Sequence, residues 1–226
     1  KLDVLVEYLC RQAGEMGALN VLAEIEESHA LFNLLRAVGF SVVSWESIWQ
    51  LPQQWPEEHA SVNWLVPSPA DEVAIRSLFQ TLVPPLVQNA TPFTNGSTRR
   101  VIYKTNCDVL AYVEIQEGSQ GIFLTPVVHP SVENVPALLV GLSRYFQSPG
   151  RPVYLQVRSY QAWLSEALGQ VQAEPSPRFA LLVKHLAVGI HNLVMQTQRV
   201  RSDTRQAEPT APIVQTYQDA QPSTKG

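Results

Sequence analysis

The first fifty residues carry two helical and two strand-like patterns of apolar positions. Apolar side chains recur at helical spacing over residues 2–16, and Gly17 can end that helix in a left-handed conformation. "ALNVLAEIEE" follows, a short run that is mostly apolar until its acidic end, and it predicts a strand whose residues 22–25 lie inside a parallel sheet. Ser28 then precedes a second helix over residues 30–38, and residues 40–51 are rich in β-branched and aromatic side chains. The predicted order is helix, strand, helix, strand.

Four prolines between residues 52 and 70 predict a break in regular structure and a linker. A helix is expected from Asp71 to about residue 82, followed by "RRVIYKT", "DVLAYVEIQE" and "GIFLTPVV", which read as an antiparallel meander. The second and third of these strands are expected to meet in a tight turn at Gly118 and Gly121. Helix, strand, helix and strand then return over residues 134–188. We call residues 1–51 the first block and residues 134–188 the second block.

The two blocks share a register as well as an order. Three pairs of positions differ by 133, and a fourth pair, Ala30 and Ala162, differs by 132; the three pairs are Leu5 with Leu138, Leu22 with Leu155, and Ser28 with Gln161. Matching helix and strand patterns alone would produce part of this agreement. The constant spacing favours a duplication, in which residues 1–51 are the C-terminal half of a first domain whose early strands precede Lys1. Residues 52–70 are then the linker, residues 71–195 a second domain, and residues 196–226, rich in Gln, Thr, Pro and charge, a disordered tail.

Charge and composition exclude several classes of function. The net charge is −4 and the isoelectric point is near 5.7, so nothing favours binding to nucleic acid or to an anionic membrane. No apolar run is long enough to span a bilayer and no signal peptide opens the chain, which predicts a soluble, cytoplasmic protein. Cys10 and Cys107 lie far apart, and none of the five histidines reaches metal-ligand spacing, so no metal is expected. We expect both cysteines to be small buried hydrophobes.

Two stretches resemble the GNAT superfamily of acyl-CoA-dependent N-acyltransferases, and specifically its tandem-domain members. "SHALFNLLRAVGF" is similar to the family's late helix that runs into Gly-Phe and a strand, and "FLTPVVHPSVENVPALLVGL" is similar to its central strand, exit and following helix. The resemblance covers residues 1–51 and about 62–190. It implies an α/β fold, a mixed twisted sheet flanked by helices in two related copies. It also implies acetyl-CoA or another acyl-CoA as co-substrate, and the amine of a small molecule or a peptide as acceptor.

The resemblance assigns the binding of acyl-CoA in the second domain to Val128, Glu133, Asn134 and Val135, around the turn after the central strand. That turn is glycine-rich in the family, so that backbone N–H groups can approach the pyrophosphate. Here it contains no glycine, Glu133 brings a negative charge, and Pro136 removes a backbone donor. We therefore expect the second domain to bind acetyl-CoA weakly or not at all, with Glu133 simply complementing the helix dipole.

The resemblance also offers few candidates for catalysis. Family enzymes often carry a tyrosine four residues before the late glycine, whereas this chain has Leu35 and Ser165 at those positions. Glu24 is the candidate base, because a carboxylate on that strand could accept the proton of an ammonium substrate. The alternative is that Glu24 belongs, with Glu26 and Glu27, to the solvated acidic end of a strand. Two functions therefore stand open: an N-acyltransferase with a non-catalytic second domain, or a non-catalytic ligand-binding or structural scaffold of the same fold.

Overall fold

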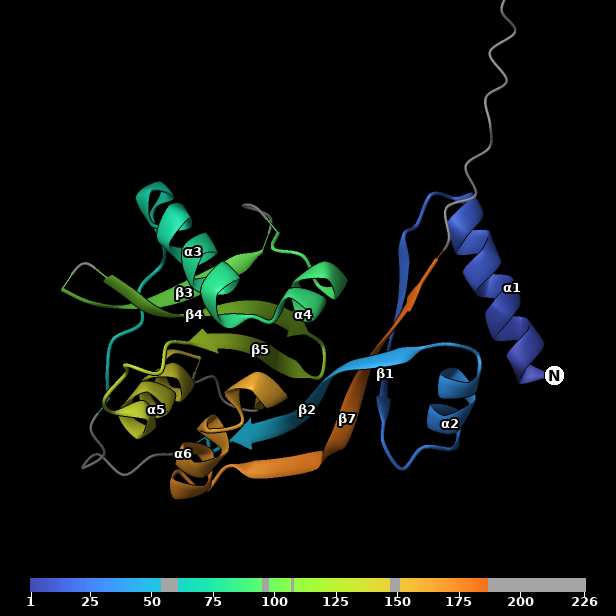
Figure 1. Ribbon diagram of the computed structural model, residues 1–226. Coiled ribbons are helices and arrows are strands. Elements are labelled where there is room, and N and C mark those ends of the chain that lie inside the picture. The colour runs from blue at the N-terminus through green and yellow to red at the C-terminus, as the bar shows by residue number, and fades with distance from the viewer. Residues whose placement is uncertain (54–60, 95–97, 107, 147–150, 187–226) are drawn as a thin grey trace, which may run out of the picture. The chain divides into compact units, whose positions relative to one another are not determined.

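A computed structural model describes residues 1–53, 61–94, 98–106, 108–146 and 151–186 (Figure 1). Contacts divide the chain into two units, Lys1–Gly189 and Ile190–Gly226, and all described residues belong to the first. The tail predicted over 196–226 and the predicted buried Cys107 lie outside the described residues.

The helices and strands predicted from the sequence form at the expected places. In chain order the described elements are α1 (Leu2–Glu15), β1 (Asn20–Glu26), α2 (Ala30–Ala37), β2 (Ser41–Leu51), the 3₁₀ turn η1 (Pro69–Asp71), α3 (Glu72–Leu82), α4 (Pro85–Ala90), β3 (Arg99–Thr105), β4 (Asp108–Gly118), β5 (Gly121–Val128), α5 (Val135–Tyr145), β6 (Val153–Arg158), the 3₁₀ turn η2 (Ser159–Gln161), α6 (Leu164–Gln170) and β7 (Glu174–His185). The short helix α4 was not predicted; Pro84 and Pro85 end one helix and start this one, because proline suits a first helical turn.

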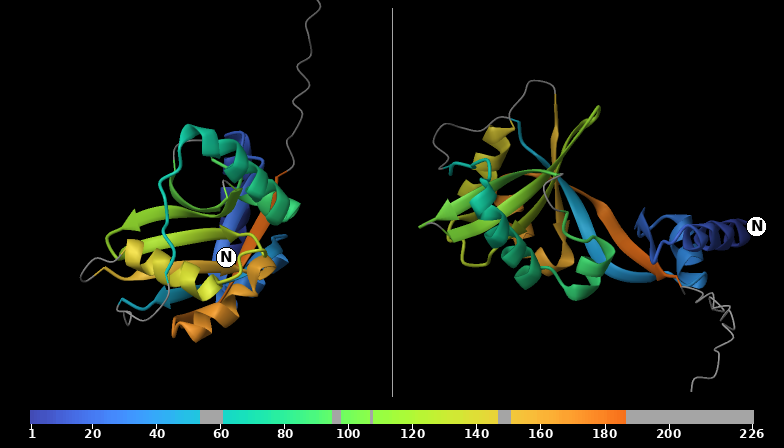
Figure 2. Two further views of the ribbon diagram at one scale, coloured as in Figure 1. Left: turned by 90° about the vertical axis from the view of Figure 1, so that its left-hand side faces the viewer. Right: turned by 90° about the horizontal axis from the view of Figure 1, so that it is seen from above.

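The strands form one seven-stranded sheet in the order β1-β7-β2-β6-β5-β4-β3 (Figures 1 and 2). Every neighbouring pair is antiparallel except β5 and β6, which are parallel from Ile122↔Val153 to Leu124↔Leu155. The meander β3-β4-β5 is present, with Gly118 opposite Gly121 at its second turn. The predicted class, a mixed sheet flanked by helices, is confirmed.

The prediction that residues 22–25 lie inside a parallel sheet is wrong. β1 stands at the edge of the sheet and pairs antiparallel with β7, from Asn20↔His185 to Glu26↔Phe179. Leu22 is accordingly 44% exposed. A short run of apolar residues fits either kind of strand, and the neighbour that decides between them lies more than 150 residues further along the chain.

The ladder between β2 and β7 is symmetric about its centre. Glu46 pairs with Phe179, and these positions differ by 133. Three of the four pairs before this centre have a counterpart after it at the same offset, the exception being Ser44↔Leu181: Ser41↔Val183 with Gln50↔Glu174, Val42↔Leu182 with Trp49↔Pro175, and Trp45↔Ala180 with Ser47↔Arg178. The last strand of each block thus lies beside an earlier strand of the other block, because β2 also pairs with β6, and β7 with β1.

The outer strands correct one of the aligned pairs. Glu24 pairs with Leu181, whose counterpart 133 positions earlier is Ile48, and Ile48 pairs with Gln156. By the same route Ala23 corresponds to Leu155, so the offset between β1 and β6 is 132 and Leu22 is not the counterpart of Leu155. Burial agrees, because Leu155 is fully buried whereas Leu22 is not. A slip of one residue in a strand moves a side chain to the opposite face, so this difference decides which side chains correspond.

The hydrophobic core consists of three groups of buried side chains, each lying between helices and the sheet. α5 and α6 pack on the face that carries Leu155 and Val157, whereas α3 and α4 pack on the face that carries Tyr112 and Val127. α1 and α2 pack on β2 and β7 around Cys10, which is buried as predicted. No helix among the described residues is long and apolar enough to cross a membrane.

The described part of the proline-rich segment packs on both neighbouring layers. The indole N–H of Trp64 donates to the carbonyl of Leu138 at 3.0 Å, and the N–H of Val62 donates to the carbonyl of Ala137 at 3.3 Å, both on α5. Leu65 forms a β-bridge with Ile102 of β3. Residues 1–51 and 71–186 thus share one sheet, and their division into two duplicated domains stays a prediction.

Candidate functional site

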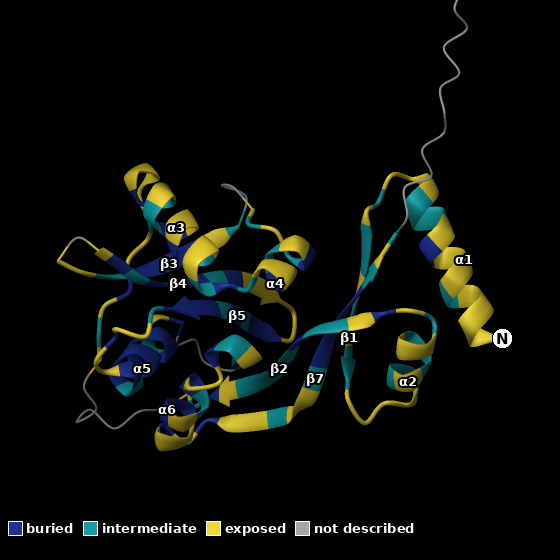
Figure 3. Ribbon diagram, in the orientation of Figure 1, coloured by how far each residue is buried: buried dark blue, intermediate teal, exposed yellow. Residues whose placement is uncertain are grey.

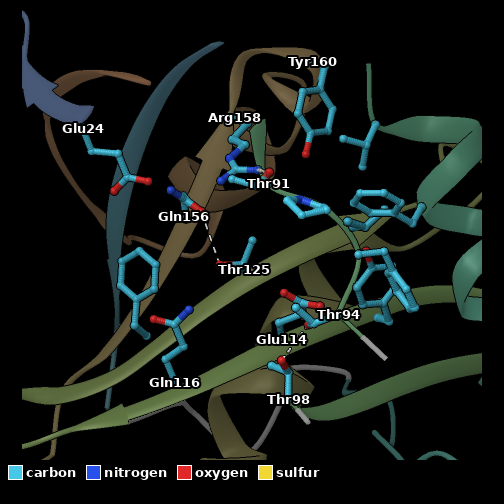
Figure 4. A pocket seen from close by; sticks show the side chains of 17 residues that line it. Glu24, Thr91, Thr94, Thr98, Glu114, Gln116, Thr125, Gln156, Arg158 and Tyr160 are labelled. Atoms are coloured by element: carbon cyan, nitrogen blue, oxygen red, sulfur yellow. Dashed lines mark hydrogen bonds between the residues drawn. The ribbon is translucent and has the colours of Figure 1, made fainter. Parts of the chain in front are cut away.

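A cavity of about 290 Å³ opens on the face of the sheet that α3 and α4 cover (Figure 4). Strand alternation places Gln156 and Arg158 of β6 on this face, beside Thr125 of β5 and Glu114 of β4. Tyr160 of η2 and three threonines of the segment before β3 complete much of the polar wall. We call this the polar cavity.

Arg158 is held in the wall of the polar cavity by a buried carboxylate. Its Nε lies 3.4 Å from Oε2 of Glu46, and its Nη1 donates to the Thr91 hydroxyl at 3.2 Å. The Gln156 amide donates to the same Glu46 oxygen at 2.7 Å. Burial raises the pKa of Glu46, the nearby Glu24 carboxylate raises it further, and Arg158 opposes both by favouring the charged form. The positive charge of Arg158 is therefore largely balanced by the Glu46 carboxylate, to which it is paired.

Glu114, in the opposite part of the wall, is compensated in the same way. The buried Arg100 donates to its Oε1 from Nε at 3.1 Å and from Nη2 at 2.8 Å. Arg100 also lies 3.5 Å from a carboxylate oxygen of Glu72 and 4.4 Å from the centre of the Phe93 ring. Glu114 is thus paired with Arg100, whose guanidinium also lies close to Glu72.

Glu24, the candidate base, is brought into the polar cavity by β1. In Figure 4 the carboxylate of Glu24 lies at one side of the cavity. Glu24 is on β1, and none of the other labelled residues belongs to that strand. Within the described ranges no hydrogen bond or ion pair joins the Glu24 side chain to another residue. Tyr112 and Tyr160 line the cavity as neutral phenols, because burial raises the pKa of each. Glu24 is therefore a carboxylate without a local counter-charge among partners that are otherwise paired or neutral.

The four residues assigned to acyl-CoA lie elsewhere, at the end of β5 and the start of α5. Val128 and Val135 are buried, Glu133 and Asn134 are exposed, and none of the four lines the polar cavity. The Asn134 side chain caps α5 by accepting from the N–H of Ala137 at 2.9 Å. The structure therefore groups these four residues with each other but not with Glu24.

Gln161 occupies the gap that opens between β5 and β6 beyond Leu124↔Leu155. We call this region the strand gap. Gln161 is 3% exposed; its Oε1 accepts from the Val128 N–H at 2.7 Å, and its Nε2 donates to the Pro126 carbonyl at 2.9 Å. The sequence comparison identified Gln161 only as the residue aligned with Ser28. It gave no sign that the side chain would turn back onto β5.

The first part of the turn from His129 to Val135 uses its donors internally. The N–H of Ser131 donates to Nδ1 of His129 at 3.1 Å, and the N–H of Val132 donates to the His129 carbonyl at 3.1 Å. The N–H groups of Glu133, Asn134 and Val135 have no hydrogen-bond partner among the described residues, but the carboxylate of Glu133 brings a negative charge to the same turn, which disfavours a diphosphate there. The residues at the strand gap and this turn do not fit an acyl-CoA. No group of three or more His, Cys, Asp or Glu suited to a metal occurs within the described ranges.

Among the solved structures with similar folds are acetyltransferases and a protein of unknown function. The chain is similar to a functionally unknown conserved protein from Staphylococcus epidermidis, with a TM-score of 0.58, 10% identity, and coverage of 80% of this chain and 79% of that one. It is also similar to a GCN5-related N-acetyltransferase from Kribbella flavida, with a TM-score of 0.54, 15% identity, and coverage of 82% and 76%. A tandem GNAT protein from the clavulanic acid biosynthesis pathway aligns with a TM-score of 0.50, 12% identity, and coverage of 80% and 69%.

No protein-family model matches the sequence, and no curated protein matches it either. At these identities the structural likeness establishes the fold alone. The chain therefore has the fold of the GNAT superfamily, as the resemblance of its sequence predicted.

Proposed function

We propose that this chain is the amine-binding part of an acyl-CoA-dependent N-acyltransferase, and that its second domain does not hold the acyl-CoA. The fold supports the class of reaction. The polar cavity supports the binding of the acceptor, a small-molecule amine or the amine of a peptide. A cytoplasmic location and acetyl-CoA as the acyl donor belong to the same proposal.

One observation carries this assignment: the charge balance of the polar cavity. Arg158 is paired with Glu46, and Glu114 is paired with Arg100, so Glu24 is the carboxylate on the wall that has no cationic partner among the described residues. Such a cavity favours a ligand with one positive charge and a polar body that hydrogen-bonds to threonine, glutamine and tyrosine side chains.

Glu24 has two tasks in this proposal. It attracts the ammonium group of the acceptor, and it accepts the proton that must leave before the nitrogen can act as a nucleophile. Gln161 closes the strand gap beside α5 and β6. In this proposal the acyl-CoA would therefore bind beside α1 and β1, which are the corresponding elements of the first block.

Calorimetric titration with primary amines tests the proposal. We expect amines to bind to the chain in the absence of acyl-CoA, and we expect Glu24→Gln to weaken binding by about fivefold, which corresponds to a Coulomb attraction of about 1 kcal/mol in a hydrated site. Glu26→Gln is the matched control, because it removes the same charge from the same strand at a residue that does not line the cavity. Equal losses in the two variants would show that the cavity does not place the amine at Glu24.

The second candidate is a non-catalytic scaffold of the same fold, and the closed strand gap favours it. In a longer chain the two functions separate through turnover. If Glu24 is the base, Glu24→Gln abolishes acetyl transfer while the affinity for acetyl-CoA is unchanged. A scaffold shows no transfer in either form.

A further inference from the structure

The strand gap begins where a parallel ladder stops. β5 and β6 pair up to Leu124↔Leu155, and beyond this point the next groups on β5 that face β6 are the Pro126 carbonyl and the Val128 N–H. In a parallel sheet a single residue of the neighbouring strand bonds to two such groups, which flank the residue opposite to it. The gap therefore offers one acceptor and one donor at the spacing that an amide-bearing chain would use.

The Gln161 carboxamide satisfies both groups at once. Its oxygen accepts from the Val128 N–H and its nitrogen donates to the Pro126 carbonyl, at 2.7 and 2.9 Å. We infer that the strand gap is an amide-binding slot and that Gln161 is its built-in occupant, which closes the slot to the amide-bearing arm of an acyl-CoA. The ligand class of the open slot is an extended chain with a secondary amide, such as pantetheine.

The local structure holds Gln161 in place. It is the last residue of η2, which follows β6 without a break. The backbone therefore positions the Gln161 side chain at the end of β6, next to β5. Removing the carboxamide would leave a buried N–H and a buried carbonyl without partners, so a ligand must replace both bonds to compete.

Asn134 supports the inference at the other end of the same region. Its side chain accepts from the N–H of Ala137 in the first turn of α5, where the resemblance places the pyrophosphate. Gln161 thus takes both backbone groups of the slot, and Asn134 takes one backbone N–H of the first turn of α5. Gln156 of β6 is a second buried glutamine near β5, but its amide does not bond to the backbone of β5. It donates to Glu46 and accepts from Thr125 instead.

Truncating Gln161 tests whether the slot exists. We expect Gln161→Ala to bind pantetheine at least about tenfold more tightly than the wild type does in a calorimetric titration, because the two backbone groups become available. Acetamide should raise the melting temperature of Gln161→Ala and leave that of the wild type unchanged. Gln161→Met is the matched control: it loses the same two hydrogen bonds but fills the space, so neither probe should bind to it.

Two results would overturn the inference. One is equal pantetheine binding by the wild type and by Gln161→Ala, including no binding by either. The other is a gain in Gln161→Met as large as in Gln161→Ala. Should Gln161→Ala fail to fold, hydrogen exchange in the wild type decides, because a Val128 N–H held by Gln161 must be protected whether or not pantetheine is present. Amine binding in the polar cavity is measured without either probe, so a failure here leaves the proposed function standing, and the reverse also holds.

Discussion

α1 and α5 hold corresponding places in the two blocks, yet they differ in burial. α5 begins 133 positions after α1, and eight of its eleven residues are buried, whereas Cys10 is the buried residue of α1. Figure 3 shows this directly, with α5 largely dark and α1 largely yellow. Several large apolar side chains of α1 are more than half exposed, among them Leu2, Val4, Leu5 and Leu9.

The difference lies in what surrounds each helix. α5 packs against the meander, against α6 and against Trp64, and the neighbouring strand β6 has β5 on its outer side. α1 lies beside β1, which is the edge of the sheet among the described strands. An apolar stripe on a helix therefore specifies a face that can be buried, whereas the neighbouring elements determine whether it is buried.

The largest expected effect comes from truncating matched leucines on the two helices. Leu138→Ala in α5 removes a side chain that is 1% exposed, so it should lower the free energy of unfolding by about 2–5 kcal/mol. Leu5→Ala, at the corresponding position of α1, removes one that is 51% exposed and should change it by about 0.5 kcal/mol or less. Urea denaturation measures both values. An equally large loss in Leu5→Ala would mean that α1 is covered in solution.

A smaller effect is expected at Gly141 and its counterpart Tyr8. A Cβ atom on Gly141 would stand 2.1 Å from the carbonyl oxygen of Val62, so α5 can approach the proline-rich segment only with glycine there. Gly141→Ala should destabilise the fold by about 1–3 kcal/mol, as overpacking does. Tyr8 is exposed, and Tyr8→Ala should be nearly neutral. Thermal unfolding of both variants compares them, and an unchanged melting temperature for Gly141→Ala would contradict this contact.

The smallest effect is a dependence of stability on pH at the centre of symmetry, where Glu46 lies opposite Phe179. The folded state raises the pKa of Glu46 above its ordinary value of 4.5, chiefly by burial. Its contribution to stability is therefore complete below pH 4.5 and declines as the pH rises through the raised pKa, because the folded protein must then ionise a buried group. Glu46→Gln should lack this decline, so its stability relative to the wild type rises over that range. Urea titrations at several pH values measure the trend, and a parallel course of the two proteins would refute it.

The sequence predicted the elements and their order well, because each depends on local patterns. Helical spacing over residues 2–16, glycine at position 39 and the glycines at 118 and 121 mark boundaries that the structure reproduces within a few residues. The meander was also predictable, since consecutive strands with a tight turn pair with each other. These features need no information from distant parts of the chain.

The place of β1 in the sheet and most of the site were not predictable in the same way. β1 pairs with a strand from the far end of the described chain, and the offset of 132 in β1 against 133 in β2 cannot be read from apolar patterns that match at either value. Glu24 was predicted to belong to the site from the family resemblance, in which a carboxylate on this strand could accept the proton of the substrate, and its role as a base stays a prediction. Arg158, Glu46 and Gln161 were not predicted, because polar residues in a sequence do not reveal whether they are buried or which partner they meet.

The exchange of strands between the blocks also fixes when the first block can fold during synthesis. Glu26 at the end of β1 pairs with Phe179, and Ser41 at the start of β2 pairs with Val183, so these ladders cannot form until nearly all of the described chain has left the ribosome. Pairings so far apart in sequence carry a large loop-closure cost and slow the search for the native state. The strands of the meander pair with strands that are adjacent in sequence, so the meander can form before the ladders of β1 and β2. Until β6 and β7 have been synthesised, β1 and β2 lack the partners that they have in the described sheet, and the apolar side chains that pack on β7 are not yet covered by it.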